Sequence, residues 1–303
     1  MKTKMMMLGL LLTCFAFTAN AQTMNSRSYI APSGSDNRGC TRSQPCRTFD
    51  GAMAKTEEGG EIVALETNTY DPVTVTKSVT LTAANGADVV IKATHGNAVT
   101  ISPVPGATVV LRGLKLAGPG KSTNSNGVQL AVSQGSNLAM FIENCVISDF
   151  GNGVNVSVST NARVSINDSV IRNNTNGLTV EMVGSDSGSM AVARTRFERN
   201  SVGVNAMGGN SVSIKESAAS SNDIGFLARA GANILLFNCM ATQNVTGVES
   251  RALGEVVIGY SIVSGNDIGM DAQGSIKTMG NNIIHGNESQ IHGFQNVTAL
   301  PPQ

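Results

Sequence analysis

Apolar and polar positions of this chain recur with a long period. From about residue 107 onward, a turn that reads Asn-x-x-Gly-apolar returns every 21 to 26 residues. A degenerate last copy carries Asn287 with Gln290 and Ile291. A fixed period of this length predicts a solenoid, in which each unit buries its apolar edge only against its neighbours. The turn glycines are Gly127, Gly153, Gly177, Gly203, Gly225, Gly247 and Gly269.

Alignment of the copies on these glycines produces three apolar columns. The residues one after the glycine are Val128, Val154, Leu178, Val204, Phe226, Val248, Met270 and Ile291. The residues six before it are Ile147, Ile171, Phe197, Ala219, Ala241, Val263 and Ile284. The residues eleven before it are Ile142, Ile166, Val192, Ile214, Leu236, Ile258 and Met279. Because each column lies within a two-residue alternation, every repeat is expected to supply three short strands facing one interior.

These repeats exclude two other solenoids. They are longer than the coils of left-handed hexapeptide helices, which take about 18 residues, and they lack the leucine pattern and helix of leucine-rich repeats. The sequence therefore predicts an all-β fold: a single-stranded right-handed parallel β-helix of about ten coils with a short N-terminal helical cap.

Polar residues form two further columns. Three residues before the glycine stands Asn124, then Phe150 as the exception, then Asn174, Asn200, Asn222, Asn244 and Asn266. Stacked amides can hydrogen-bond along the helix axis, and both Asn and Gly are expected to adopt the left-handed conformations of tight corners. Eight residues before the glycine, Cys145 and Cys239 share a column of small residues. At about 4.8 Å per coil they lie roughly 19 Å apart, so we expect free, buried thiols.

The chain is predicted to divide into residues 1–21, 22–60, 61–291 and 292–303. The first segment has a basic start, an apolar run and a small-x-small site, and so reads as a signal peptide cleaved after Ala21. Lipidation at Cys14 is disfavoured by Thr13 before it. No later stretch reaches 18 apolar residues, so we expect no membrane span and a secreted or periplasmic protein.

Residues 22–60 are predicted to cap the β-helix. Cys40 and Cys46 read as a local disulfide of an exported protein. Thr48 is expected to cap an amphipathic helix over Phe49–Glu58, and such a helix would cover unpaired strand edges. The tail, 292–303, is expected to cover the other end. The expected strands before the repeats are Ser28–Pro32, Glu61–Leu65, Val73–Val75, Val79–Ala83, Val89–Ala93 and Ala98–Ile101.

The lead-in segments YIAPSGSD, CTRSQPCRTFDGAMA, GGEIVAL and YDPVTVTKSVTL, followed by the NCVIS and N-x-x-G-V repeats, carry a family resemblance. Over about residues 28–290 the chain resembles secreted bacterial right-handed β-helix repeat proteins of the pectin-lyase-like superfamily. The resemblance implies the fold and leaves the function open, because that superfamily contains lyases, hydrolases, epimerases, adhesins and proteins without known activity.

Enzymes of that superfamily act mostly on acidic polysaccharides, and their signatures are missing from this sequence. There is no pectate-lyase Asp/Glu cluster, no Gly-His-Gly with Arg-x-Lys, and no Asp-Pro-x-Asp, since Asp71-Pro72 is a lone dipeptide. No metal site is predicted, because His285 and His292 lack a third ligand. No cofactor is expected, and Ca²⁺ would enter only if the protein were a lyase.

Outward positions are where a site would lie. Asn144, Asp168, Arg194, Glu216 and Asn238 form one column and predict a surface salt ladder, which Arg172 beside Glu198 is expected to continue.

Glu249 and Asp271 share another outward column on adjacent coils, with Arg229 and Arg251 in the next. Two carboxylates about 5 Å apart repel each other, which raises the pKa of one of them. The same distance matches the spacing of the two carboxylates in retaining glycosidases. The arginines can instead satisfy both carboxylates as a surface network. The catalytic candidates are Glu249, Asp271 and Arg251, and the binding candidates are Arg229 and Glu181.

Charge and aromatic content narrow the partners. Lys+Arg and Asp+Glu number 21 each, so no basic stripe exists for nucleic acid. Aromatics are 4% of the chain, which disfavours stacking on neutral sugars. The first hypothesis is a monomeric, exported β-helix without a catalytic signature, which is either a scaffold or a glycan- or surface-binding protein. Its expected partner is an acidic polysaccharide or a cell-surface glycan. The alternative is a polysaccharide lyase or glycoside hydrolase that acts on an acidic polysaccharide.

One apolar strip is also predicted on the surface of the late coils. A partner, self-association or the covering tail could explain it. Its residues are Leu235, Phe237, Met240, Val257, Tyr260 and Ile262.

Overall fold

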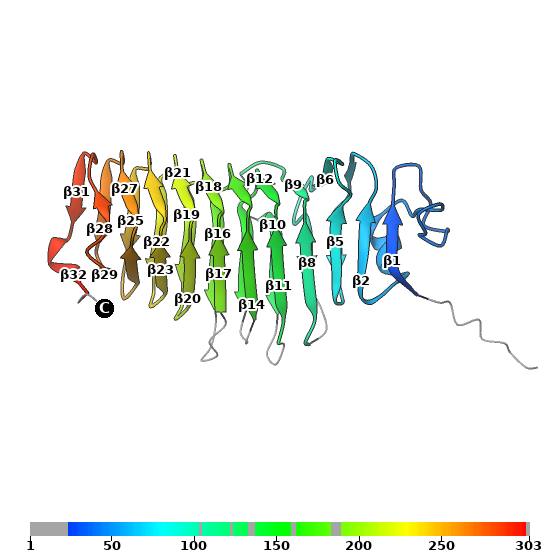
Figure 1. Ribbon diagram of the computed structural model, residues 1–303, viewed down its shortest axis with the longest axis horizontal. Coiled ribbons are helices and arrows are strands. Elements are labelled where there is room, and N and C mark those ends of the chain that lie inside the picture. The colour runs from blue at the N-terminus through cyan, green and yellow to red at the C-terminus, as the bar shows by residue number, and fades with distance from the viewer. Residues whose placement is uncertain are drawn as a thin grey trace, which may run out of the picture.

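The computed structural model describes residues 24–102, 105–121, 124–132, 137–158, 162–182 and 189–300. The predicted signal peptide lies outside the described residues. Within them the chain forms an elongated stack of coils, with the N-terminal strand at one end and the C-terminal strand at the other (Figure 1). No described helix is long and apolar enough to cross a membrane.

Three parallel sheets run the length of this stack, and each coil visits them in the same order. Sheet 1 contains β1 (Asn25–Ile30), β2 (Thr56–Ala64), β5 (Val79–Ala83), β8 (Thr108–Arg112), β11 (Ala139–Glu143), β14 (Arg163–Asn167), β17 (Ser189–Ala193), β20 (Ser211–Lys215), β23 (Asn233–Phe237), β26 (Glu255–Gly259), β29 (Ser275–Thr278) and β32 (Val297–Ala299).

The chain then crosses into two ten-stranded sheets. Sheet 2 contains β3 (Asn68–Tyr70), β6 (Val89–Lys92), β9 (Lys115–Ala117), β12 (Val146–Ser148), β15 (Val170–Arg172), β18 (Arg196–Glu198), β21 (Ala218–Ser220), β24 (Met240–Thr242), β27 (Ile262–Ser264) and β30 (Ile283–Ile284). Sheet 3 contains β4 (Val73–Val75), β7 (Val99–Ile101), β10 (Asn126–Val132), β13 (Asn152–Val158), β16 (Asn176–Met182), β19 (Val202–Met207), β22 (Ile224–Arg229), β25 (Thr246–Ser250), β28 (Ile268–Ala272) and β31 (Ser289–His292).

The predicted apolar columns are confirmed as rows of paired, buried residues. Ile142 pairs with Ile166 in sheet 1, Ile147 with Ile171 in sheet 2, and Val128 with Val154 in sheet 3. The last coil departs from the prediction, because Thr278 rather than Met279 pairs with Ile258. These columns make one continuous core along the axis.

The predicted asparagine ladder is also confirmed. At every rung after Asn174, the Oδ1 atom accepts hydrogen bonds from the backbone N and Nδ2 of the asparagine one coil earlier. Asn174 Oδ1 accepts only from the backbone N of Phe150, which replaces the asparagine there. For Asn222 these two bonds, from Asn200, are 2.9 and 3.2 Å long. The Nδ2 atom of Asn222 donates to Asn244 Oδ1 at 2.9 Å and to the Phe197 carbonyl at 3.1 Å. The ladder asparagines, all buried, are Asn174, Asn200, Asn222, Asn244, Asn266 and Asn287.

The turn glycines have a different purpose from the one predicted. Neither they nor the ladder asparagines adopt left-handed conformations; these belong to the residue just before each asparagine, such as Asn173 (φ 56°) and Gln243 (φ 57°). The glycines are required because the coils approach closely. A Cβ at Gly225 would lie 2.5 Å from the carbonyl oxygen of Gly247, and the same contact repeats along the column.

The N-terminal cap is more tightly joined to the β-helix than predicted. Helix α1 spans Phe49–Met53, with the Thr48 side chain accepting from the Gly51 N–H at 2.9 Å. It ends five residues before the predicted Glu58, because the Thr56 hydroxyl bonds the Ser28 hydroxyl at 2.8 Å and the chain enters β2 at that residue. The strand β1, placed in the cap by prediction, is the first strand of sheet 1.

All four cysteines of the described residues are placed as predicted. Cys40 and Cys46 form a disulfide, with Cα atoms 4.6 Å apart. Cys145 and Cys239 are free and buried. Burial raises the pKa of Cys145 to about 11 and also raises that of Cys239, so both remain protonated near neutral pH.

The tail does not cover the apolar strip. Its strand β32 pairs with β29 and so extends sheet 1 at the end of the stack. With residues 292–300 in that place, Leu235, Phe237, Met240 and Tyr260 remain exposed, and the Phe237 and Tyr260 ring centroids lie 5.0 Å apart. The covering-tail interpretation of the strip is therefore wrong for the described part of the chain.

Substitution of one ladder asparagine should destabilise the whole stack. Asn222→Leu removes the side-chain acceptor of the Asn200 backbone N–H and the side-chain donor to the Phe197 carbonyl, at about 1–3 kcal/mol for each unsatisfied buried group. We expect the melting temperature, followed by circular dichroism, to fall by about 5 °C or more. Asn233→Leu, at an exposed asparagine of sheet 1, is the matched control. An unchanged melting temperature for Asn222→Leu would contradict the ladder's role.

Candidate functional site

The outer face of sheet 3 carries a row of amides that parallels the buried ladder. Asn126 Nδ2 donates to Asn97 Oδ1 at 2.8 Å, Asn152 Nδ2 to Asn126 Oδ1 at 2.9 Å, and Asn176 Nδ2 to Asn152 Oδ1 at 3.0 Å. We call Asn97, Asn126, Asn152 and Asn176 the outer amide row. All four are half-buried, so this row lines the surface instead of the core.

A second outward column of sheet 3 runs beside this row. It begins with polar groups, where Asn155 Nδ2 donates to Gln129 Oε1 at 3.0 Å and the Thr179 hydroxyl donates to Asn152 Oδ1 at 2.9 Å. From Thr179 to Glu249 the column is buried although it faces outward, whereas Asp271 is half-buried and His292 is exposed. Strand pairing places its members in the order Gln129, Asn155, Thr179, Asn205, Leu227, Glu249, Asp271 and His292.

Two arginines border the buried part of that column. Arg229 Nε donates to Asn205 Oδ1 at 3.1 Å, and Arg251 Nε donates to Glu249 Oε1. The Glu249 side chain is only 2% exposed, whereas Arg251 is 44% exposed. Arg251 therefore stands between the solvent and a buried carboxylate.

The environment of Glu249 disfavours its charge. Burial raises the pKa of Glu249 most, the hydrogen bond and charge of Arg251 oppose that rise, and the charge of Asp271 adds to it. Sequence reasoning expected repulsion between two carboxylates to raise one pKa. The direction is the same, but the main cause is burial.

The structure brings Glu249, Arg251 and Asp271 together and adds a residue that sequence reasoning missed. Asp271 pairs across strands with Glu249 on one side and with His292 on the other. Gln273 Nε2 donates to Asp271 Oδ2 at 3.1 Å. His292 occupies the position two residues after the turn in the last, degenerate repeat, so the repeat alignment held the signal.

The predicted binding residues do not form one cluster. Glu181 is exposed on β16, and Met207 on β19 separates it from Arg229 on β22. Among the described residues no ion pair joins Glu181 to Arg229.

Solved structures with this architecture are known, although no protein-family model and no curated protein matches the sequence. Pectate lyase Pel9A superimposes with a TM-score of 0.67 and 14% identity, covering 91% of this chain and 79% of its own. XylC in complex with xylose superimposes with a TM-score of 0.63 and 11% identity, covering 84% of this chain and 67% of its own. A rhamnogalacturonan lyase superimposes with a TM-score of 0.51 and 11% identity, covering 90% of this chain and 86% of its own.

The chain shares the right-handed parallel β-helix fold of these structures. Identities of this size establish the fold alone, so the ligand of this β-helix has to be argued from its own side chains. Among its described residues, no group of three or more His, Cys, Asp or Glu side chains is arranged to hold a metal ion.

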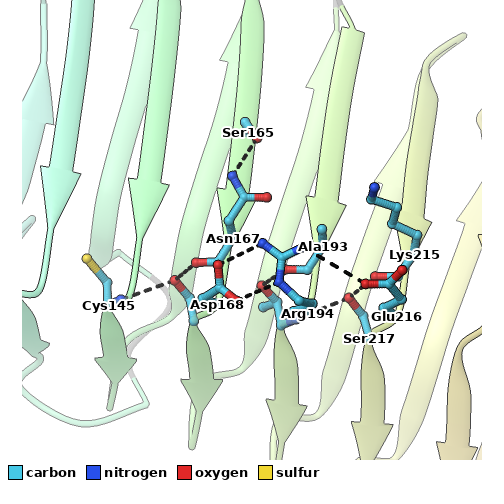
Figure 2. A network of polar contacts seen from close by, with 11 residues as sticks. Cys145, Ser165, Asn167, Asp168, Ala193, Arg194, Lys215, Glu216 and Ser217 are labelled. Atoms are coloured by element: carbon cyan, nitrogen blue, oxygen red, sulfur yellow. Dashed lines mark hydrogen bonds and ion pairs between the residues drawn. The ribbon is translucent and has the colours of Figure 1, made fainter.

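A second charged region of the β-helix lies at the corner between sheets 1 and 2, and it confirms the predicted salt ladder (Figure 2). Arg194 binds Asp168 through two hydrogen bonds of 2.7 and 2.8 Å and approaches Glu216 at 3.9 Å. These three residues are exposed and occupy left-handed corner positions with φ near 50°. Such exposed pairs contribute little free energy, and the single arginine charge is already compensated by two carboxylates. This corner is a structural surface.

The expected continuation of that ladder in sheet 2 is wrong. Arg172 pairs with Glu198 across strands, but the Glu198 carboxylate binds Arg196 on its own strand at 3.2 Å. Arg172 is left without an ion pair among the described residues.

The buried carboxyl should make stability depend on pH. Because its pKa is raised in the folded state, Glu249 keeps its proton to a higher pH there than in the unfolded chain. The free energy of unfolding of the wild type, relative to Glu249→Gln, should therefore fall as pH rises through and above 4.5, the ordinary carboxyl value.

Urea unfolding of both proteins between about pH 4 and pH 8 measures this difference. Glu181→Gln removes an exposed carboxylate from the same sheet and is the matched control. If the free energy of unfolding of the wild type, relative to Glu249→Gln, instead rises with pH, the attraction of Arg251 for the Glu249 carboxylate outweighs the effect of burial.

Proposed function

We propose that this protein is an exported β-helix that binds an acidic glycan along the outer face of sheet 3. The observation that carries the proposal is the outer amide row, which repeats one amide per coil over successive coils. Each Asn Nδ2 has two N–H donors, and the contacts within the row use one of them. A regular line of donors and acceptors matches an extended polymer of hydroxyl-bearing rings better than a compact ligand.

The preference for an acidic polymer rests on the arginines at the C-terminal end of this face. Arg229 binds only neutral partners, Asn205 Oδ1 and the Met207 sulfur. Its positive charge is not compensated by a carboxylate in the described structure. A guanidinium fork suits the carboxylate of a uronate, because two parallel hydrogen bonds can form.

The structural neighbours support the same class of ligand. Two of them are a pectate lyase and a rhamnogalacturonan lyase, named for the polysaccharides pectate and rhamnogalacturonan. At 11–14% identity they support the glycan class and no particular polymer.

Export is proposed on two independent grounds. The disulfide Cys40–Cys46 is typical of an oxidising compartment. Residues 1–21 have the composition of a signal peptide, cleaved after Ala21. We propose a monomer that acts in the periplasm or outside the cell.

Binding can be tested with polygalacturonate, alginate and a glycosaminoglycan, each immobilised for surface plasmon resonance. We expect at least one polymer to bind the mature protein, and Arg229→Gln to weaken that binding about tenfold, since it removes a charge-assisted contact. Raised salt should weaken it further. Arg163→Gln, which removes an exposed arginine from sheet 1, is the control. Equal losses in both variants, or no binding to any polymer, would overturn the proposal.

A second candidate function is glycan cleavage, and one observation favours it. Glu249 has a raised pKa and lies beside Asp271, as a general acid beside a carboxylate would. The burial of Glu249 argues the other way, because a substrate could reach it only after Arg251 moved aside. Ca²⁺ belongs to the lyase version alone. Asp271 is the one carboxylate of this cluster that Arg251 does not bind. A single carboxylate supplies too few oxygen ligands for Ca²⁺, which takes six to eight.

Turnover assays distinguish these two functions. With the same polymers, in the presence and absence of Ca²⁺, we expect no unsaturated or reducing ends to be released. If ends are released and Glu249→Gln abolishes the release, the protein is an enzyme that uses this site. Release that survives Glu249→Gln would place catalysis elsewhere and reject the cluster.

A further inference from the structure

A groove of about 400 Å³ lies on the outer face of sheet 2, away from the proposed glycan face on sheet 3. It crosses five neighbouring strands, β6, β9, β12, β15 and β18. Among the residues that line it are Lys115, Val146, Ser148, Val170, Arg172 and Arg196.

Its shape follows from strand register. Lys115, Val146, Val170 and Arg196 are successive cross-strand neighbours in a single outward column. Two valines therefore form the floor, and a cation stands at each end, about 14 Å apart along the axis at the usual strand spacing. Arg172 lies in the adjacent outward column, next to Ser148.

The three cations of the groove are not equivalent. Lys115 Nζ lies 2.7 Å from Asp88, and Arg196 Nε lies 3.2 Å from Glu198, so both charges are compensated. Arg172 has no ion pair in the described structure, and its Nε atom is buried without a hydrogen-bond partner. Few buried donors in folded proteins lack an acceptor, because a donor that loses water without gaining another acceptor destabilises the fold. A ligand that supplies an acceptor at this point would remove that destabilisation.

We propose that this groove binds a compact carboxylate whose body rests on Val146 and Val170. The carboxylate would accept hydrogen bonds from the Arg172 guanidinium, and the flat or puckered ring of the ligand would cover the valine floor. Two sources share this chemistry: a uronate at the end of a glycan and a free organic acid with an apolar ring. The proposal does not depend on the glycan face of sheet 3, because the two sites share no residue.

Isothermal titration of the mature protein with sodium galacturonate and with sodium cyclohexanecarboxylate tests the site. We expect one equivalent of at least one carboxylate to bind, and Arg172→Gln to weaken it about tenfold or more. Tighter binding of galacturonate identifies a glycan end as the source, and tighter binding of cyclohexanecarboxylate identifies a free organic acid. Neutral galactose should not bind, and Arg163→Gln should bind as the wild type does.

A second variant guards against a folding artefact. Val170→Asp places a carboxylate on the groove floor from an outward position, so it should abolish binding while the melting temperature stays near that of the wild type. The proposal is overturned if neither carboxylate binds, if Arg172→Gln binds as well as the wild type, or if inorganic sulfate binds as tightly as both carboxylates. The last result would show that the valine floor contributes nothing.

Discussion

The close stacking of successive coils is the constraint on which the rest of this structure depends. A buried amide such as Asn222 is satisfied only when another asparagine lies one coil before it and another one coil after it. The glycine column enforces the same spacing from the other side, because the Gly247 carbonyl lies where a Cβ of residue 225 would be. Polar satisfaction and steric fit therefore both require one register, and a coil that slipped by one residue would lose both at once.

This constraint divides the chain into positions that serve the stack and positions that do not. Inward residues such as Ile142 and Val128 fill the core, and the corner residues turn the chain. The outward columns are free of that requirement, so their chemistry is informative. On sheet 3 they carry hydrogen-bonded amides that end in a buried carboxylate, and on sheet 2 they carry a valine floor beside an unpaired arginine. Neither arrangement is needed to keep the coils in register.

Sequence periodicity predicted what depends on the repeat and missed what depends on contacts between specific side chains. The apolar columns, the asparagine ladder, the free thiols and the corner salt ladder all follow from counting residues. Counting could not show that Thr56 bonds Ser28 and shortens the helix, or that Glu198 binds Arg196 rather than Arg172. It correctly placed Glu249 at an outward strand position. It could not show that the Glu249 side chain is nevertheless buried and is bound by Arg251.

The distribution of charge supports the proposal of an acidic ligand despite the balanced composition. Lys+Arg equals Asp+Glu, so no long-range field steers a polyanion toward the surface. Recognition must then rest on individual cations whose charge is not already used. At the corner between sheets 1 and 2, Arg194 is fully engaged by Asp168 and offers little. Arg229 and Arg172 have no carboxylate partner among the described residues: Arg229 binds neutral groups, and the Glu198 carboxylate next to Arg172 is bound by Arg196. Uncompensated cations in a neutral protein are the positions where a carboxylate ligand gains most, because no internal ion pair has to break first.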